Sequence, residues 1–131
     1  MMMLMTTLKA EAAGLSFDLA SITRDPHRLT WFPFRSGVRI HRVYGTGQDG
    51  KASSAFLLYE PGARVPRHTH TGFEHVFVLT GSQTDDNGEH GAGSFVVNPP
   101  GSSHEVFSPG GCLVLIVWEA PIVFDSVSPL R

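Results

Sequence analysis

The chain has 131 residues, with 10 basic and 12 acidic side chains and a formal net charge of −2 at neutral pH. This length leaves room for one domain, and the charge balance gives no basic field that would attract nucleic acid or an anionic membrane. The one cysteine excludes an internal disulfide and is typical of a reducing compartment, so we expect a cytoplasmic protein. No run of eighteen apolar residues predicts a membrane span, and the start lacks the basic segment of a signal peptide.

Residues 1–35 are expected to form an N-terminal arm. Residues 7–13 are rich in Ala, Lys and Glu and precede Gly14, which predicts one short helix. Residues 17–33 show no clean period, and two X-Pro pairs interrupt them. We expect an aromatic cluster to anchor the arm to its own sheet, the alternative being a groove on a second copy. This cluster consists of Trp31, Phe32 and Phe34.

Residues 36–131 are expected to form a single β-domain. Short apolar or alternating runs are separated by Gly and Pro turns, and Asn87-Gly88 is a strong hairpin signal. Eight or nine short strands with almost no helical period predict an all-β sandwich or barrel. The clearest strands are expected at 38–44, 53–60, 75–79, 95–98, 104–107 and 112–119.

The segment from Gly62 to Gly81 carries the clearest chemical signal. His68 and His70 are two residues apart, and side chains at that spacing in a strand point to the same face. Glu74 follows after a short glycine-containing turn, which can bring its carboxylate back towards the two imidazoles. The segment therefore predicts three ligands of one metal site.

A second segment supplies a fourth candidate ligand. An apolar strand after Gly93 ends in a Pro-Pro-Gly turn, and His104 follows that turn. Three imidazoles and one carboxylate suit a single divalent transition metal, such as Fe, Zn, Mn or Ni. The remaining histidines are expected at the surface: His75 points to the opposite face from Glu74, and His27, His41 and His90 lack ligand spacing.

The two segments resemble the paired motifs of the cupin superfamily, G-x5-H-x-H-x3-E-x6-G and G-x5-P-x-G-x2-H-x3-N. Ser108 stands where the second pattern has Asn. The resemblance implies a double-stranded β-helix, or jelly-roll barrel, with the four ligands on one metal. It also implies a homodimer, because cupins commonly pair sheet to sheet. The matching residues are Gly62, His68, His70, Glu74 and Gly81 in the first motif, and Gly93, Pro99, Gly101 and His104 in the second.

Looser marks are similar to ChrR-like cupins, a domain found at the carboxyl end of some zinc-dependent anti-sigma factors and as free-standing small proteins. They are Trp31 with Pro33, the segment 61–70, V-L-T-G-S with residues 85–88, and Gly111-Cys112. No cysteine-histidine anti-sigma domain precedes the cupin segment in this sequence, so regulation of a sigma factor is not carried over.

Two functions remain open from the sequence. One is a metal-dependent dioxygenase acting on a small organic substrate, in which the metal keeps an exchangeable position. The other is a non-catalytic domain that senses a metal or a small ligand. In the enzyme, apolar side chains would line the pocket and exclude water, and the candidates are Phe73, Phe77, Phe95 and Trp118. We assign no catalytic residue and no organic cofactor.

Overall fold

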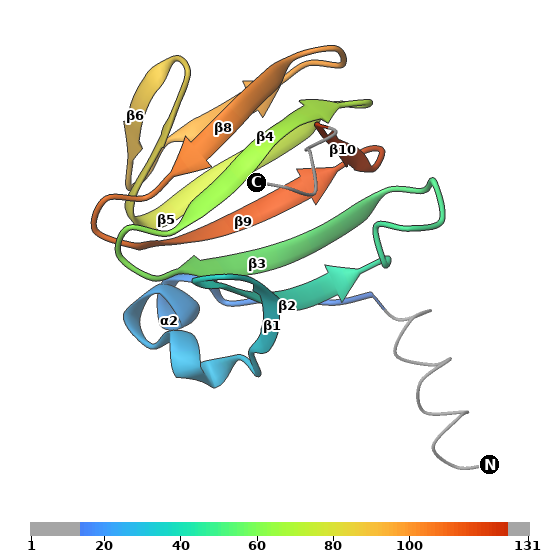
Figure 1. Cartoon of the computed structure of the whole chain (residues 1–131). Coiled ribbons are helices and arrows are strands. Elements are labelled where there is room, and N and C mark those ends of the chain that lie inside the picture. The colour runs from blue at the N-terminus through green and yellow to red at the C-terminus, as the bar shows by residue number, and fades with distance from the viewer. Residues whose placement is uncertain (1–13, 126–131) are drawn as a thin grey trace, which may run out of the picture.

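The computed structural model describes residues 14–125, and the helix predicted at 7–13 lies outside them (Figure 1). Within this range the chain is almost entirely β. Its strands are β1 (Phe32–Arg35), β2 (Val38–Tyr44), β3 (Ser53–Tyr59), β4 (Arg64–His70), β5 (Glu74–Asp85), β6 (Gly88–Gly91), β7 (Phe95–Asn98), β8 (Ser103–Phe107), β9 (Cys112–Trp118) and β10 (Ile122–Phe124). The all-β prediction is confirmed.

The strands form one antiparallel sheet that curls on itself in the order β1-β2-β3-β9-β5-β8-β4-β10, with β6 and β7 also paired to β5 (Figure 1). Strand β5 makes the curl possible because it is 12 residues long. Its first half pairs with β7 and β9, whereas its second half pairs with β6 and β8. The chain therefore passes from one layer to the other along a single strand.

Most strands follow the sequence prediction, and two were not predicted. Strand β1 contains Pro33, although proline interrupts the strand pattern in the sequence. Because β1 lies at the edge of the sheet, a proline is tolerated there. Strand β10 is three residues long and pairs with the ligand-bearing strand β4. The predicted arm boundary at residue 35 falls within the β1–β2 hairpin.

The arm contains a short helix, α2 (Leu19–Arg24), and a 3₁₀ turn, η1 (Pro26–Arg28), where the sequence showed no period. Six residues are too few to display a 3.6-residue repeat. The signals that were present are the caps. The Asp18 side chain accepts hydrogen bonds from the backbone N–H and hydroxyl of Ser21, at 3.3 and 2.6 Å. No helix among residues 14–125 is long and apolar enough to cross a membrane.

Alternation along the strands produces two apolar clusters. The larger one fills the interior of the curled sheet, and the smaller one lies between the arm and the outer face of β3 and β9. Trp31 packs in the outer cluster, and its Nε1 donates to the carbonyl of Pro26 at 2.9 Å. Phe34 packs against the interior cluster instead, while Phe32 is 58% exposed. The arm is therefore anchored to its own sheet, the first of the two alternatives.

Gly81 shows why the end of the first motif requires glycine. Its φ is +70°, and an added Cβ would lie 2.0 Å from the carbonyl oxygen of Gly111. At this point β5 bends across the turn that precedes β9. Both the backbone conformation and the close approach therefore exclude a side chain.

We predict that Gly81→Ala lowers the free energy of unfolding by at least about 1–3 kcal/mol, the cost of a non-glycine residue in this conformation. Gly91→Ala is the control, because nothing lies within 4 Å of its added Cβ and its φ is not positive. Urea denaturation of both variants gives the comparison. Equal denaturation midpoints for the two variants would contradict this account.

Candidate metal centre

Three strands bring the four predicted ligands to one end of the barrel. His68 and His70 lie on the same side of β4, and both are buried. Antiparallel pairing of β4 with β8 places His104 directly opposite His68. Glu74 begins β5 immediately after the turn, in which Gly72 approaches Ala120 too closely to carry a Cβ. Each ligand position is therefore fixed by backbone pairing or by a tight turn.

The ligand atoms of the four side chains lie within 4.8 Å of one another. The Nε2 atoms of His68 and His104 are 3.1 Å apart. Glu74 Oε1 lies 3.2 Å from His70 Nε2 and 3.8 Å from His104 Nε2. Three imidazole nitrogens and one carboxylate oxygen thus surround a common point.

The outer nitrogens show how the imidazole protons are arranged. His68 Nδ1 lies 2.8 Å from the Pro66 carbonyl, which only accepts, so Nδ1 must carry the proton. The Ser102 hydroxyl donates to the Pro99 carbonyl at 2.6 Å and therefore accepts from His70 Nδ1 at 2.9 Å. In neutral rings with this proton arrangement, both Nε2 atoms direct lone pairs into the centre.

The carboxylate is held in the same manner. Asn98 Nδ2 donates to Glu74 Oε1 at 3.0 Å, and Trp118 Nε1 donates to Oε2 at 2.7 Å. Such outer contacts orient metal ligands in known sites. Because the inner atoms are acceptors, and His70 Nε2 is buried with no hydrogen-bond partner, the cluster lacks a positive group at its centre. A divalent cation fits this donor set.

The electrostatics favour the metal-binding protonation states. Burial lowers the pKa of His68 and of His104 below the ordinary histidine value, which favours neutral imidazoles. Burial alone would raise the pKa of Glu74. The nearby imidazoles, above all that of His70, nevertheless hold this pKa below its usual range. At neutral pH these shifts favour neutral imidazoles at His68 and His104 beside an ionised Glu74.

The structure separates the four residues that were expected to line the pocket. Trp118 is buried and lines the cavity beside the ligands. Phe73, Phe77 and Phe95 do not line it, because Phe77 and Phe95 alternate with the inward-facing valines of β5 and β7. They are 40%, 45% and 53% exposed on the outer face of the sheet. His75 stacks between Phe73 and Phe95 on this face, as expected from its position next to Glu74.

Several supporting residues were not predicted. Asn98 and Ser102 flank the Pro-Pro-Gly turn. Polar residues are common in turns, so nothing in the sequence singles these two out as contacts of the metal ligands. Asp85 is buried and accepts from His90 Nε2 at 3.0 Å, so His90 is not simply solvated as expected. His41 likewise differs, because its Nδ1 lies 2.8 Å from the Thr30 carbonyl beneath the arm.

Ser108, the departure from the second motif, has a structural role of its own. It is fully buried, and its hydroxyl donates to the Ser82 carbonyl at 2.7 Å. Its backbone also bonds to Gly62 and Ala63. The residue thus ties β8 to β4 and β5 at the end of the barrel away from the ligands.

Comparison with known proteins identifies the family. The ChrR cupin-like domain profile matches residues 19–121. The chain belongs to this family. A relative, the anti-sigma-E factor ChrR of Cereibacter sphaeroides, is 32% identical over 103 residues, which cover 77% of this chain and 47% of the relative. The chain therefore spans about half the length of this curated relative.

Solved structures show that the fold of this ChrR cupin-like protein is that of cupins. One is the complex of Rhodobacter sphaeroides SigE with the anti-sigma ChrR, with a TM-score of 0.65 and 23% identity, covering 86% of this chain and 65% of that chain. Another is an acetylacetone dioxygenase from Acinetobacter johnsonii, with a TM-score of 0.69 and 16% identity, covering 86% and 77%. The predicted jelly-roll fold is confirmed.

We predict that the purified protein holds about one divalent metal ion per chain and that a His68→Ala, His104→Ala double variant loses it, because half of the donor set is removed. His75→Ala is the control, since this histidine lies on the outer face. Elemental analysis of the three proteins measures the metal content. The prediction is wrong if the double variant retains a full complement.

Proposed function

We propose that this cupin binds one divalent transition metal through His68, His70, Glu74 and His104. The observation that carries the proposal is the convergence of four buried ligand atoms, of which His68 Nε2, His70 Nε2 and Glu74 Oε1 are acceptors. Two negatively polarised atoms at 3.1–3.2 Å repel each other unless a cation or a proton lies between them. The Nδ1 proton of His68 leaves its Nε2 as an acceptor, and the lowered pKa values of His68 and His104 disfavour a second proton on either ring, so a cation fits this centre.

We infer further that the site serves a dioxygenase acting on a small organic substrate. The supporting observation is a cavity of about 20 Å³ lined by His68, Glu74 and His104 on one side. This space suffices for one water-sized molecule. The opposite walls are mainly apolar, including Val106, Ile116 and Trp118. The ligand cluster is therefore open on one side to a small apolar chamber rather than closed all round.

The chain's own residues would have two tasks in this reaction, beside holding the metal. A redox-active metal such as iron, when bound, supplies the ability to activate dioxygen. Asn98 and Trp118 fix both oxygens of Glu74, so the carboxylate keeps its orientation. The apolar walls exclude bulk water from the chamber. The name of the structurally similar acetylacetone dioxygenase is consistent with this class of chemistry.

The alternative function is a non-catalytic sensing domain that passes a change at the metal site to a protein partner. The sequence relationship to the anti-sigma-E factor ChrR favours it. An aromatic surface on the outer face, made of Phe73, His75, Phe77 and Phe95 and covered by no other part of residues 14–125, also favours it, because such surfaces are typical of protein contacts. Under this hypothesis the metal or a small ligand is the signal and no turnover occurs.

Oxygen consumption by the iron-loaded protein separates the two functions. We expect uptake with a diketone, a thiol or a phenol as substrate, and none with the zinc-loaded protein, because zinc has no redox chemistry. The double variant His68→Ala, His104→Ala, treated with iron in the same way, is the control. Tightly held zinc together with no uptake by the iron form would contradict the enzyme and leave the sensing domain.

We also propose a homodimer that pairs through the aromatic surface defined above. The cluster around Trp31 was the alternative source of a contact with a second copy, but Trp31 packs against its own sheet. The uncovered apolar surface lies instead on β5 and β7, where sheet-to-sheet packing can bury it. We expect a dimer mass by light scattering at micromolar concentration and a monomer mass for Phe77→Glu, Phe95→Glu. A monomeric wild type would refute the proposal.

A further inference from the structure

A second, larger pocket opens at the ligand end of the barrel. Its volume is about 210 Å³, and it shares Phe34, Trp118 and Ile122 with the small chamber beside the metal ligands. A molecule in this pocket would be separated from the ligand cluster by one layer of side chains. One member of that layer, Trp118, donates directly to Glu74.

The pocket combines an apolar floor with a cationic rim. Phe34, Trp118, Ile122 and Phe124 form the floor. The rim carries Arg35, Arg42, Thr46 and Gln48, and none of the described residues that line the pocket is Asp or Glu. This local excess of positive charge contrasts with the formal net charge of −2 for the whole chain. Such a distribution attracts an anion that also presents an apolar body.

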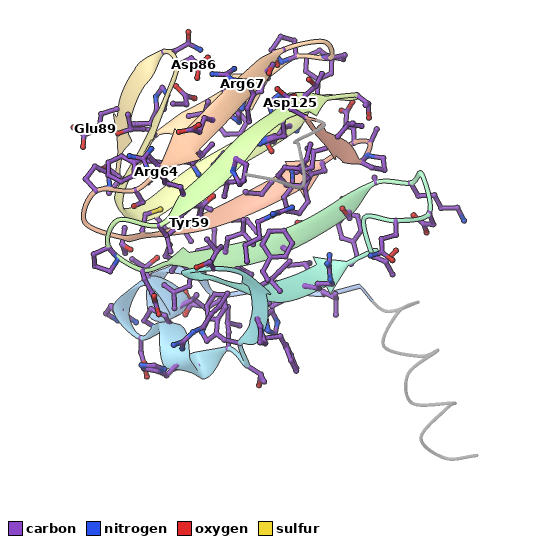
Figure 2. The ribbon with its side chains drawn as sticks, viewed as in Figure 1. Tyr59, Arg64, Arg67, Asp86, Glu89 and Asp125 are labelled. Atoms are coloured by element: carbon purple, nitrogen blue, oxygen red, sulfur yellow. The ribbon has the colours of Figure 1, made fainter. Side chains whose placement is uncertain are left out.

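The two arginines of the rim differ from other arginines of the barrel in having no carboxylate partner among residues 14–125. Arg64 pairs with Glu105 at 3.0 Å, and Arg67 pairs with Asp86 at 2.9 Å on the outside of the barrel (Figure 2). None of the ion pairs within residues 14–125 includes Arg35 or Arg42. Their guanidinium groups therefore remain available to an external anion.

Arg42 is also on an unexpected side of its strand. In β2, Val38 and Ile40 face the barrel interior, whereas Arg39 and His41 face outwards. Arg42 follows the inward parity and lines the mouth pocket. Arg35 is held in place by stacking, since its guanidinium carbon lies 3.6 Å from the Phe124 ring centroid. A fixed planar guanidinium is suited to bidentate contact with a carboxylate.

We propose that this mouth pocket binds a small carboxylate with a flat apolar body, such as an aromatic acid, next to the metal site. The carboxylate contacts Arg42 and Arg35, and the apolar body lies on Phe34 and Trp118. This inference rests on the proposed function, because it names the substrate or ligand class of the same site.

Isothermal titration calorimetry of the metal-loaded protein with benzoate tests the proposal. We expect a Kd of about 1 mM or lower, with benzamide and acetate each at least about tenfold weaker because each lacks one half of the ligand. Arg42→Gln should weaken benzoate by about tenfold or more. Arg39→Gln removes the same charge from the opposite face of β2 and should leave the affinity unchanged.

Failure of benzoate to bind the metal-loaded wild type would overturn the proposal, as would equal affinities for wild type and Arg42→Gln, or equal losses in both variants. Metal content is measured on the same samples. A wild type that holds no metal contradicts the proposed function. A metal-loaded wild type that does not bind benzoate contradicts only the proposed ligand class. The two failures are thus distinguishable.

A separate observation concerns the outer nitrogen of His104. The Asp85 side chain is 1% exposed, and its Oδ1 accepts from the backbone N–H of Asn87 at 2.8 Å and from His90 Nε2 at 3.0 Å. Its Oδ2 is buried without a hydrogen-bond partner and lies 3.4 Å from His104 Nδ1. The geometry points to Asp85 as a positioning residue that holds the Nδ1 proton of His104 and directs Nε2 to the metal, with His90 fixing Asp85.

We expect Asp85→Asn to weaken zinc binding by about tenfold or more in competition with a chromophoric chelator, and to change the visible spectrum of the cobalt-loaded protein. Asp49→Asn, an equal change of charge in an exposed loop, is the control. His90→Ala should act in the same direction by a smaller factor, and it decides the question alone if Asp85→Asn does not fold. Unchanged zinc affinity and cobalt spectrum in a folded Asp85→Asn variant, or in His90→Ala when that variant decides alone, would overturn the assignment.

Discussion

Four buried ligand atoms that face one another are the constraint on which the ligand end of this barrel depends. Burying a carboxylate and three imidazoles is unfavourable unless each polar atom finds a partner. The outer atoms of His68, His70 and Glu74 find theirs in Pro66, Ser102 and Trp118, while Asn98 donates to the inner oxygen of Glu74. The inner atoms remain, and their mutual repulsion is relieved only by positive charge. The protein scaffold thus satisfies every position of the site except its centre.

Alternation along the strands also gives the sheet an apolar outer face, and the N-terminal arm covers only one part of it. A row of paired residues crosses β2, β3, β9, β5 and β7 on that face, from His41 and Phe56 through Leu115 to Phe77 and Phe95. Phe17 of the arm packs edge-on against His41 and Phe56 and covers the first part. The second part has no cover among residues 14–125, and its phenylalanines stack on each other at 4.5 Å. The apolar surface runs across all five strands, whereas the arm covers only the first part of it.

The sequence predicted what depends on local spacing. His68 and His70 share a face because they are two residues apart in a strand. The strands predicted at 38–44 and 95–98 have the same bounds in the structure. The assignment of three phenylalanines to the pocket was wrong. Glu74 already faces the interior at the start of β5, so Phe77, at odd spacing from it, faces outwards. The six-residue helix α2 was not predicted because it is too short to show a helical period.

Partners across the sheet were the other part that sequence reasoning missed. Asp85 lies 11 residues from Glu74 along the chain, and only the bend of β5 brings its carboxylate to His104. Asn98 reaches Glu74 because β7 pairs with β5 in a register that aligns the two residues. Neither contact follows from a motif, since both depend on how the sheet curls. Outer contacts of a metal site are therefore less visible in sequence than its ligands.

Trp118 connects the possible functions physically. Its indole N–H fixes Glu74, and its ring lines both the small chamber and the mouth pocket. A ligand that presses on this ring acts on the orientation of the only carboxylate in the ligand cluster. In an enzyme this contact would make the metal respond to substrate occupancy. In a sensing domain the same contact would transmit ligand binding to the metal site. The residues that recognise a ligand can thus be shared by both functions, and what distinguishes them is whether the bound metal carries out redox chemistry.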